Sequence, residues 1–122
     1  MIKLLLDEHI SPDVASGVRR FAHGLTVHWM VEWEGGNFLG RDDAIWMPEA
    51  AAQNLTLVTY DRRTIPPLLK TRAEEGRQHG GVIFVDEKTI TQSNTGGQVR
   101  ALRNLEKEGR TWDWRDRVCF LR

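Results

Sequence analysis

Residues 2–14 read IKLLLDEHISPDV, and this stretch predicts a strand that leads directly into a helix. Residues 2–6 form an apolar run of strand length, broken only by one lysine, which is typical of a strand buried on both faces of a parallel sheet. Ser11, Pro12 and Asp13 then provide an N-cap, a proline at the first helical position and an acid in the first turn. The chain therefore opens with a βα unit.

The rest of the chain repeats the alternation of strand-like and helix-like segments. Further strands are predicted at residues 26–31, 55–60, 82–85 and 117–121, and further helices at about 42–52, 64–76 and 98–108. This alternation indicates a parallel sheet with right-handed crossovers and helices on both faces. We therefore predict an α/β three-layer sandwich with a mainly parallel central sheet of about five strands.

Several residues indicate where the predicted helices begin and which face they bury. Val14, Val18 and Phe21 recur at helical spacing in the first helix, and Thr64 is placed to cap the helix at 64–76. Pro48 lacks an amide donor, so it either kinks the helix at 42–52 or marks its true first turn.

Length and composition favour one folded domain spanning residues 1–122. The chain has 122 residues, of which 40% are hydrophobic and 28% charged, and these values exclude a disordered chain. Its 17 basic residues balance its 17 acidic ones, so net charge does not indicate a polyanionic partner. Cys119 is the single cysteine, which excludes an internal disulfide and a cysteine-rich zinc site. The first apolar run is too short for a signal peptide or a membrane span, so we expect a cytoplasmic protein with no membrane partner.

Acidic residues stand where two predicted strands end and where one helix begins. They are Asp7 and Glu8 after the first strand, Asp61 after the strand at 55–60, and Asp42 with Asp43 at the start of the helix at 42–52. Strand carboxyl ends and the N-termini of the following helices share one edge of a parallel sheet, so these carboxylates are expected to converge. Converging carboxylates repel one another unless a cation compensates. The pattern therefore predicts a site for Mg²⁺ or Mn²⁺, which prefer oxygen ligands and support phosphodiester hydrolysis.

Each acid taken alone also has an ordinary structural interpretation. Acids after strands often cap helices or solvate loops, and Asp42 is the one most easily explained as a cap. It is the convergence of three acidic positions at one predicted edge that favours the metal site.

Three segments stand out, namely KLLLDEHISP at 3–12, TYD at 59–61 and HGGVIFV at 79–85. Together with the order of elements over nearly the whole chain, they resemble the small PIN-like proteins, which are often described as nucleases or toxin components. In PIN domains an acid of the first strand, an acid opening a central helix and the acid of a Thr-x-Asp motif bind the metal. The resemblance implies that Asp7, Asp43 and Asp61 are the catalytic metal ligands and that Thr59 orients a carboxylate. The gap of 18 residues from Asp43 to Asp61 is similar to the family spacing and favours Asp43 over Asp42.

One position departs from the family pattern. Many relatives carry another acid two residues after Thr-x-Asp, where this chain has Arg63. The substitution removes a ligand and puts a second metal, and activity itself, in question. Glu8 compensates only if the chain turns after Asp7, because successive strand side chains point to opposite faces.

Basic residues are candidates for contacts with RNA phosphates. Four of them fall within about 80° of one another on a helical wheel with ~100° per residue, and two others adjoin Asp61. The four stripe residues are Arg100, Arg103, Lys107 and Arg110, and the other two are Arg62 and Arg63. A solvated helix face explains the stripe equally well, and Arg62 and Arg63 also suit ion pairs with the acids.

Aromatic residues and histidines give weaker signals. The five tryptophans are more often core or interface residues than base-stacking ones. The four histidines lack a recurring metal-ligand spacing, so they are interpreted as structural, with His9 beside Asp7 as a candidate proton carrier.

The leading functional prediction is a Mg²⁺- or Mn²⁺-dependent endoribonuclease, in its narrower form the toxin of a toxin–antitoxin pair. RNA, a cognate antitoxin protein and a second copy of the chain are the expected partners. One alternative is a PIN-like domain that binds RNA or protein without catalysis. Another is a receiver-like signalling domain, since receivers share this length, an acidic pair after the first strand and an Asp after a later one.

Overall fold

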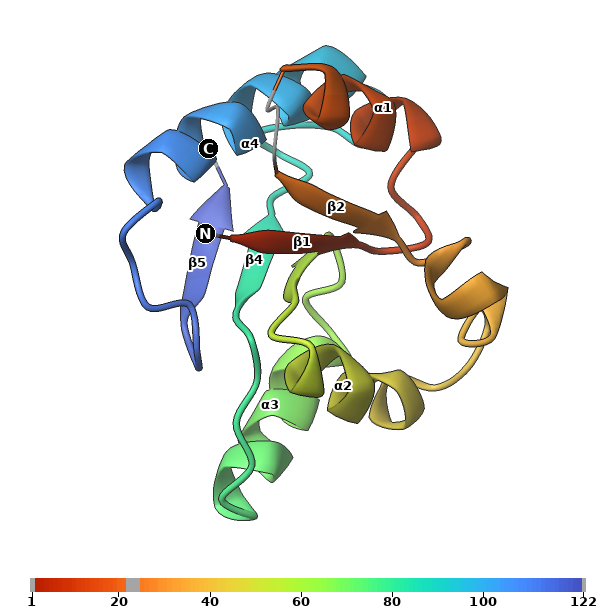
Figure 1. Cartoon of the computed structure of the whole chain (residues 1–122), viewed down its shortest axis with the longest axis vertical. Helices are drawn as coiled ribbons and strands as arrows, with labels where there is room; N and C mark the ends of the chain where they lie inside the picture. Colours follow the sequence, from red (N-terminus) through yellow and green to blue (C-terminus); the bar gives the residue numbers. More distant parts are fainter. Residues whose placement is uncertain (1, 22–24, 122) are drawn as a thin grey trace.

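The computed structural model describes residues 2–21 and 25–121 and forms a five-stranded, all-parallel sheet in the order β2-β1-β3-β4-β5. Helices lie on both sides of this sheet (Figure 1). This architecture confirms the predicted α/β three-layer sandwich. In chain order the elements are β1 (Lys3–Leu6), α1 (Pro12–Phe21), β2 (Thr26–Trp29), the 3-10 helix η1 (Trp33–Gly36), α2 (Asp43–Ala52), β3 (Thr56–Thr59), α3 (Ile65–Glu74), β4 (Val82–Val85), α4 (Thr95–Glu108) and β5 (Val118–Leu121).

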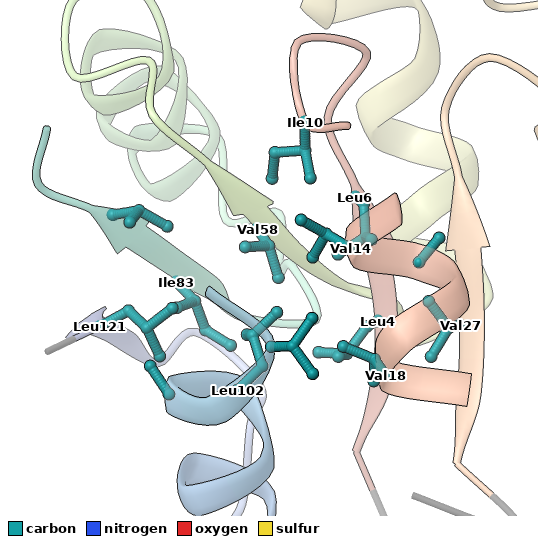
Figure 2. Close-up of a cluster of buried hydrophobic side chains, with 14 of the residues drawn as sticks. Leu4, Leu6, Ile10, Val14, Val18, Val27, Val58, Ile83, Leu102 and Leu121 are labelled. Carbon is teal, nitrogen blue, oxygen red and sulfur yellow. The ribbon is translucent and has the colours of Figure 1, made fainter. Parts of the chain in front are cut away.

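Each face of the sheet has its own hydrophobic core. Alternate residues of a strand point to opposite faces, so Leu4 and Leu6 pack with α1 and α4, while Leu5 packs with α2 and α3. Figure 2 shows the first core, where Val14 and Val18 of α1 meet the strand side chains. Both faces are covered, which explains why the β1, β3 and β4 segments are almost continuously apolar.

Four local features differ from the sequence-based expectations. Phe21 is 53% exposed, although its spacing placed it with buried Val14 and Val18. β2 ends at Trp29 because the Glu32 N–H already turns back to the Trp29 carbonyl. Helix α4 begins at Thr95, three residues early, since the Asn94 side chain accepts a hydrogen bond from the Gly97 N–H. Pro48 lies inside α2, which excludes the alternative that it marks the first turn of this helix.

Within residues 2–21 and 25–121, no helix has the length and apolar character needed to cross a membrane.

Candidate active site

The predicted acids gather at the point where the order of the strands reverses. β1 pairs with β2 on one side and with β3 on the other, and α1 and α3, which follow β1 and β3, cover opposite faces of the sheet. In such sheets a crevice opens between the two strands at their carboxyl ends, and ligands bind there. Asp7 directly follows β1 and Asp61 comes two residues after the end of β3, so both stand at this crevice.

Asp7 is held by the neighbouring strand. The register pairs Leu6 with Val58, and the Asp7 N–H continues the ladder by donating to the Val58 carbonyl at 3.0 Å. Asp7 and Thr59 therefore occupy adjacent positions on the same face of the sheet. The buried Thr59 hydroxyl donates a hydrogen bond of 2.5 Å to the Asp7 carboxylate.

Asp61 is fixed by a tight turn. Its N–H donates to Thr59 Oγ1 at 2.9 Å, and its Oδ1 accepts from the backbone N–H groups of Arg63 and Thr64, both at 2.9 Å. Burial acts to raise the pKa of this carboxyl, but the hydrogen bonds from the Thr64 hydroxyl and from the two N–H groups, together with the charge of His9, lower it below the usual value. Asp61 is therefore ionised at neutral pH.

Asp43 enters the site from the first turn of α2. The Trp46 indole N–H donates to its Oδ1 at 3.1 Å, and the Thr64 hydroxyl lies 3.1 Å from its Oδ2. The same hydroxyl also bonds Asp61. Burial raises the pKa of Asp43, and the negative charges of Asp61 and Asp7 raise it further, against the lowering effect of the hydrogen bonds from Thr64 and Trp46. The carboxylates of Asp7 and Asp61 thus interact electrostatically with that of Asp43, although the three residues belong to elements far apart in the sequence.

The donor set has the chemistry of a divalent cation site. All three acids offer carboxylate oxygens, and Mg²⁺ and Mn²⁺ prefer such ligands. Burial is the main cause of the raised pKa of Asp43, and the neighbouring charges of Asp61 and Asp7 add to it; a cation bound between these carboxylates would relieve that repulsion. In the described part of the chain, no group of three or more Asp, Glu, His or Cys side chains is close enough together to coordinate one metal ion. The hydrogen bonds of the Thr64 hydroxyl instead connect Asp43 and Asp61.

Asp42 and Glu8, the two other predicted ligands, directly adjoin Asp43 and Asp7 in the sequence. Asp42 occupies the N-cap position of α2 and is exposed, but its side chain makes no capping hydrogen bond, contrary to the expected role as a cap. Glu8 lies in the turn after β1, half-buried, with its carboxylate 3.9 Å from exposed His9. The chain does turn after Asp7, as a role for Glu8 requires.

The two arginines after Asp61 have different surroundings. The Arg62 guanidinium lies 3.8 Å from Asp86 and 5.2 Å from the centre of the Phe120 ring. Arg63 contributes its backbone N–H to Asp61, and its side chain is exposed.

Only three of the four residues of the predicted basic stripe lie on the helix. Arg100, Arg103 and Lys107 are exposed on α4, but Arg110 lies beyond the end of the helix. Arg110 donates two hydrogen bonds of 3.1 Å to the buried Glu106 carboxylate. Its charge is therefore largely compensated within the fold.

Sequence reasoning missed two residues that hold the acids. Thr64 was expected to cap α3, but its side chain makes no capping bond and serves Asp43 and Asp61 instead. Trp46 was grouped with core aromatics, and it is buried, yet its indole also bonds Asp43. A signal existed for both, because each stands three residues after an acid of the predicted site.

Among the described histidines, His79 has the structural role expected of it. The Nδ1 of buried His79 accepts a hydrogen bond of 3.0 Å from the Gly81 N–H, so this nitrogen carries no proton. His9 is exposed, and its charge contributes to the lowered pKa of Asp61. His23 lies outside the described residues.

Together, the parallel sheet and the carboxylates at its reversal point define an α/β domain with an acidic candidate site. A family model described as PIN like domain matches residues 2–88, and the chain accordingly belongs to the PIN-like domain family, which is a nuclease-type family. The match includes Asp7, Asp43 and Asp61. Comparison with curated proteins and with solved structures gives no match.

The family match also decides between two of the predicted classes. The strand order 2-1-3-4-5 is shared with receiver domains, so strand order alone does not separate them from this protein. The match to the PIN-like family covers most of the chain and favours the nuclease class.

Proposed function

We propose that this protein is a metal-dependent endoribonuclease whose reaction takes place at Asp7, Asp43 and Asp61. The observation that carries the proposal is the linkage of Asp43 and Asp61 by one hydroxyl, that of Thr64, beside the crevice at the strand reversal. Membership of the PIN-like family supports the same class of chemistry.

In this proposal the three carboxylates hold Mg²⁺ or Mn²⁺. The chemistry that such an ion would supply is activation of water and neutralisation of charge on the phosphodiester. Asp61 is prepared for this role because its hydrogen bonds keep its pKa low and its carboxylate ionised. Thr59 fixes Asp7, while Thr64 and Trp46 fix Asp43. These donors orient the ligands before the ion arrives, which is the usual task of hydrogen-bonding groups around a metal site.

A calorimetric titration of the purified full chain with Mn²⁺ tests the metal site. Wild type should bind, and Asp61→Asn should lose most of the affinity, because an amide keeps the hydrogen bonds of the turn but lacks the negative charge. Asp113→Asn is the matched control, since Asp113 is exposed and precedes β5 at the opposite edge of the sheet. Equal affinity in Asp61→Asn and wild type would sink the assignment.

Incubation of single-stranded RNA with the chain and Mn²⁺ tests the reaction. Wild type should cleave weakly and Asp61→Asn should not. The second candidate function, a PIN-like domain that binds RNA without cleaving it, is favoured by Arg63, which stands where many relatives have an acid. RNA binding without cleavage by wild type would decide for this candidate.

The narrower proposal of a toxin rests on the resemblance to small toxin-type PIN proteins. Induced expression of wild type in a bacterial host should arrest growth, and Asp61→Asn should not. A partner protein that restores growth by binding the chain would be the antitoxin.

A further inference from the structure

A surface groove of about 430 Å³ runs between α1 and α4, outside the acidic site. Helices α1 and α4 lie side by side over the same face of the sheet (Figure 1). Gly17 permits their close approach, because a Cβ there would meet a Val99 methyl group at 2.7 Å. The lining residues are Asp13, Gly17, Phe21, Thr95, Gly96, Val99, Arg100 and Arg103.

The groove combines a half-exposed aromatic ring, one face of which lies under an arginine, with arginines that lack a carboxylate partner among the described residues. Phe21 is 53% exposed, and the Arg103 guanidinium lies 5.6 Å from its ring centre. In the part of the chain that the structure describes, neither Arg100 nor Arg103 has a carboxylate within 4.0 Å. Arg62 and Arg110, by contrast, have acidic partners. Asp13 is the one acid among the lining residues.

The groove also points toward the acidic site. Helices that connect parallel strands run antiparallel to them, so the first turns of α1 and α4 lie at the carboxyl edge of the sheet. Helix α1 begins at Pro12, only five residues after Asp7. A strand of nucleic acid that leaves the crevice over α1 would therefore enter the groove at the end formed by Asp13 and Thr95.

We propose that this groove binds single-stranded RNA, with one base stacked on Phe21 and the flanking phosphates at Arg100 and Arg103. Single-stranded nucleic acids are held by this combination of aromatic platforms and basic side chains. An acidic peptide would use the arginines but has no need of an exposed aromatic ring, so the observations favour RNA. The inference rests on the proposed function and names where that substrate is held, away from the reacting phosphate.

Fluorescence anisotropy of a labelled 12-nucleotide RNA, with the full chain in EDTA, measures groove binding while cleavage is blocked. Phe21→Ala should weaken binding by about tenfold, and Phe21→Trp should retain it, because a stacked base is lost in the first and kept in the second. Ile45→Ala is the matched control, since Ile45 is 55% exposed on α2, in the opposite layer. It should bind as wild type does.

The charge contacts are measured from the salt dependence of the same assay. Arg100→Gln and Arg103→Gln should each flatten the slope of log affinity against log salt by about 0.7. Arg77→Gln and Arg115→Gln, which remove exposed arginines away from the groove, should leave the slope unchanged. Circular dichroism checks that every variant is folded.

Two results would overturn the inference. Unchanged RNA affinity in Phe21→Ala would show that no base stacks there, even if the arginine variants bind less tightly. Displacement of the RNA by a short oligoglutamate at a lower concentration than by unlabelled RNA would assign the groove to an acidic protein. Failure of the proposed function would be seen separately. In that case wild type would neither bind Mn²⁺ nor cleave RNA, but Phe21→Ala, Arg100→Gln and Arg103→Gln would still bind RNA less tightly than wild type.

Discussion

The Thr59 hydroxyl donates a hydrogen bond of 2.5 Å to the Asp7 carboxylate, although the two residues are 52 positions apart in the chain. The bond exists because β1 and β3 are neighbours and their register places Asp7 beside Thr59 on the same face. Thr59 Oγ1 also accepts the Asp61 N–H at 2.9 Å. One buried hydroxyl thus ties together the ends of the two strands that form the crevice.

Thr59→Val should lower the free energy of unfolding by about 2 kcal/mol at neutral pH, because it leaves the Asp7 carboxylate and the Asp61 N–H without their partner. Valine has nearly the same shape, so lost packing contributes little. Urea unfolding in EDTA measures the change. Thr59→Ser keeps the hydroxyl and is the control, and a Thr59→Val variant as stable as Thr59→Ser would contradict the prediction.

Thr64→Val should reduce Mn²⁺ affinity by roughly tenfold, the usual effect of losing a group that orients a metal ligand. Its hydroxyl bonds both Asp43 and Asp61, so its loss removes one orienting hydrogen bond from each carboxylate, while the Trp46 indole and the backbone N–H groups of the turn remain. Thr64 is exposed, which makes the change in stability small. Calorimetry should show that Thr64→Ser restores the affinity, and failure of serine to do so would assign the effect to packing.

Asp42→Asn should have a much smaller effect than Asp43→Asn on Mn²⁺ binding and on RNA cleavage. Asp43 bonds Trp46 and Thr64, whereas Asp42 is exposed and makes no capping bond. The two residues are adjacent and carry the same charge, so they form a matched pair. The reverse order of effects would show that the acid of α2 has been assigned to the wrong position.

Asp43→Asn should stabilise the metal-free fold at pH 7. The pKa of Asp43 is raised above its ordinary value of 3.8, first by burial and then by Asp61 and Asp7, so the ionised form destabilises the folded state. This cost is absent below pH 3.8, grows as pH rises toward the raised pKa, and is complete above it.

Thermal unfolding in EDTA checks this prediction. The melting temperature of Asp43→Asn should exceed that of wild type at pH 7, and the difference should vanish near pH 3.5, roughly where Asp43 is protonated in both states. Added Mn²⁺ should raise the melting temperature of wild type only. A variant that is less stable than wild type at pH 7 in EDTA would contradict the argument.

His79 should make the fold less stable in mild acid. Burial lowers its pKa below the ordinary 6.5, with Arg72 acting in the same direction and Asp116 opposing. The unfolded chain therefore takes up a proton first, and the free energy of unfolding falls as pH drops from about 6.5 toward the lowered pKa. His79→Gln should show a flatter decline between pH 7 and pH 5.5 in urea titrations. If the free energy of unfolding falls equally with pH in His79→Gln and in wild type, His79 is not the source of the acid sensitivity.

Much of the fold and part of the site could be predicted from local patterns. Continuous apolar runs and helix-start signals locate the elements, because burial on both faces and capping are encoded within a few residues. Parallel topology then brings Asp7 and Asp61 to one edge, since the carboxyl ends of parallel strands face the same way. The family match agrees with the predicted class.

The partners of each side chain were decided only by the tertiary structure. Sequence spacing could not show that Thr64 bonds Asp43 or that Phe21 lies open beside Arg103. These relationships depend on how far α2 and α3 slide along the sheet and on how α1 packs against α4. The amino-acid sequence by itself therefore determined which acids could meet, because the alternation of strands and helices is encoded locally along the chain. Only the packing of the elements decided that Thr59 meets Asp7 and that Thr64 meets Asp43, because these pairs are 52 and 21 residues apart and such separations carry no information about distance.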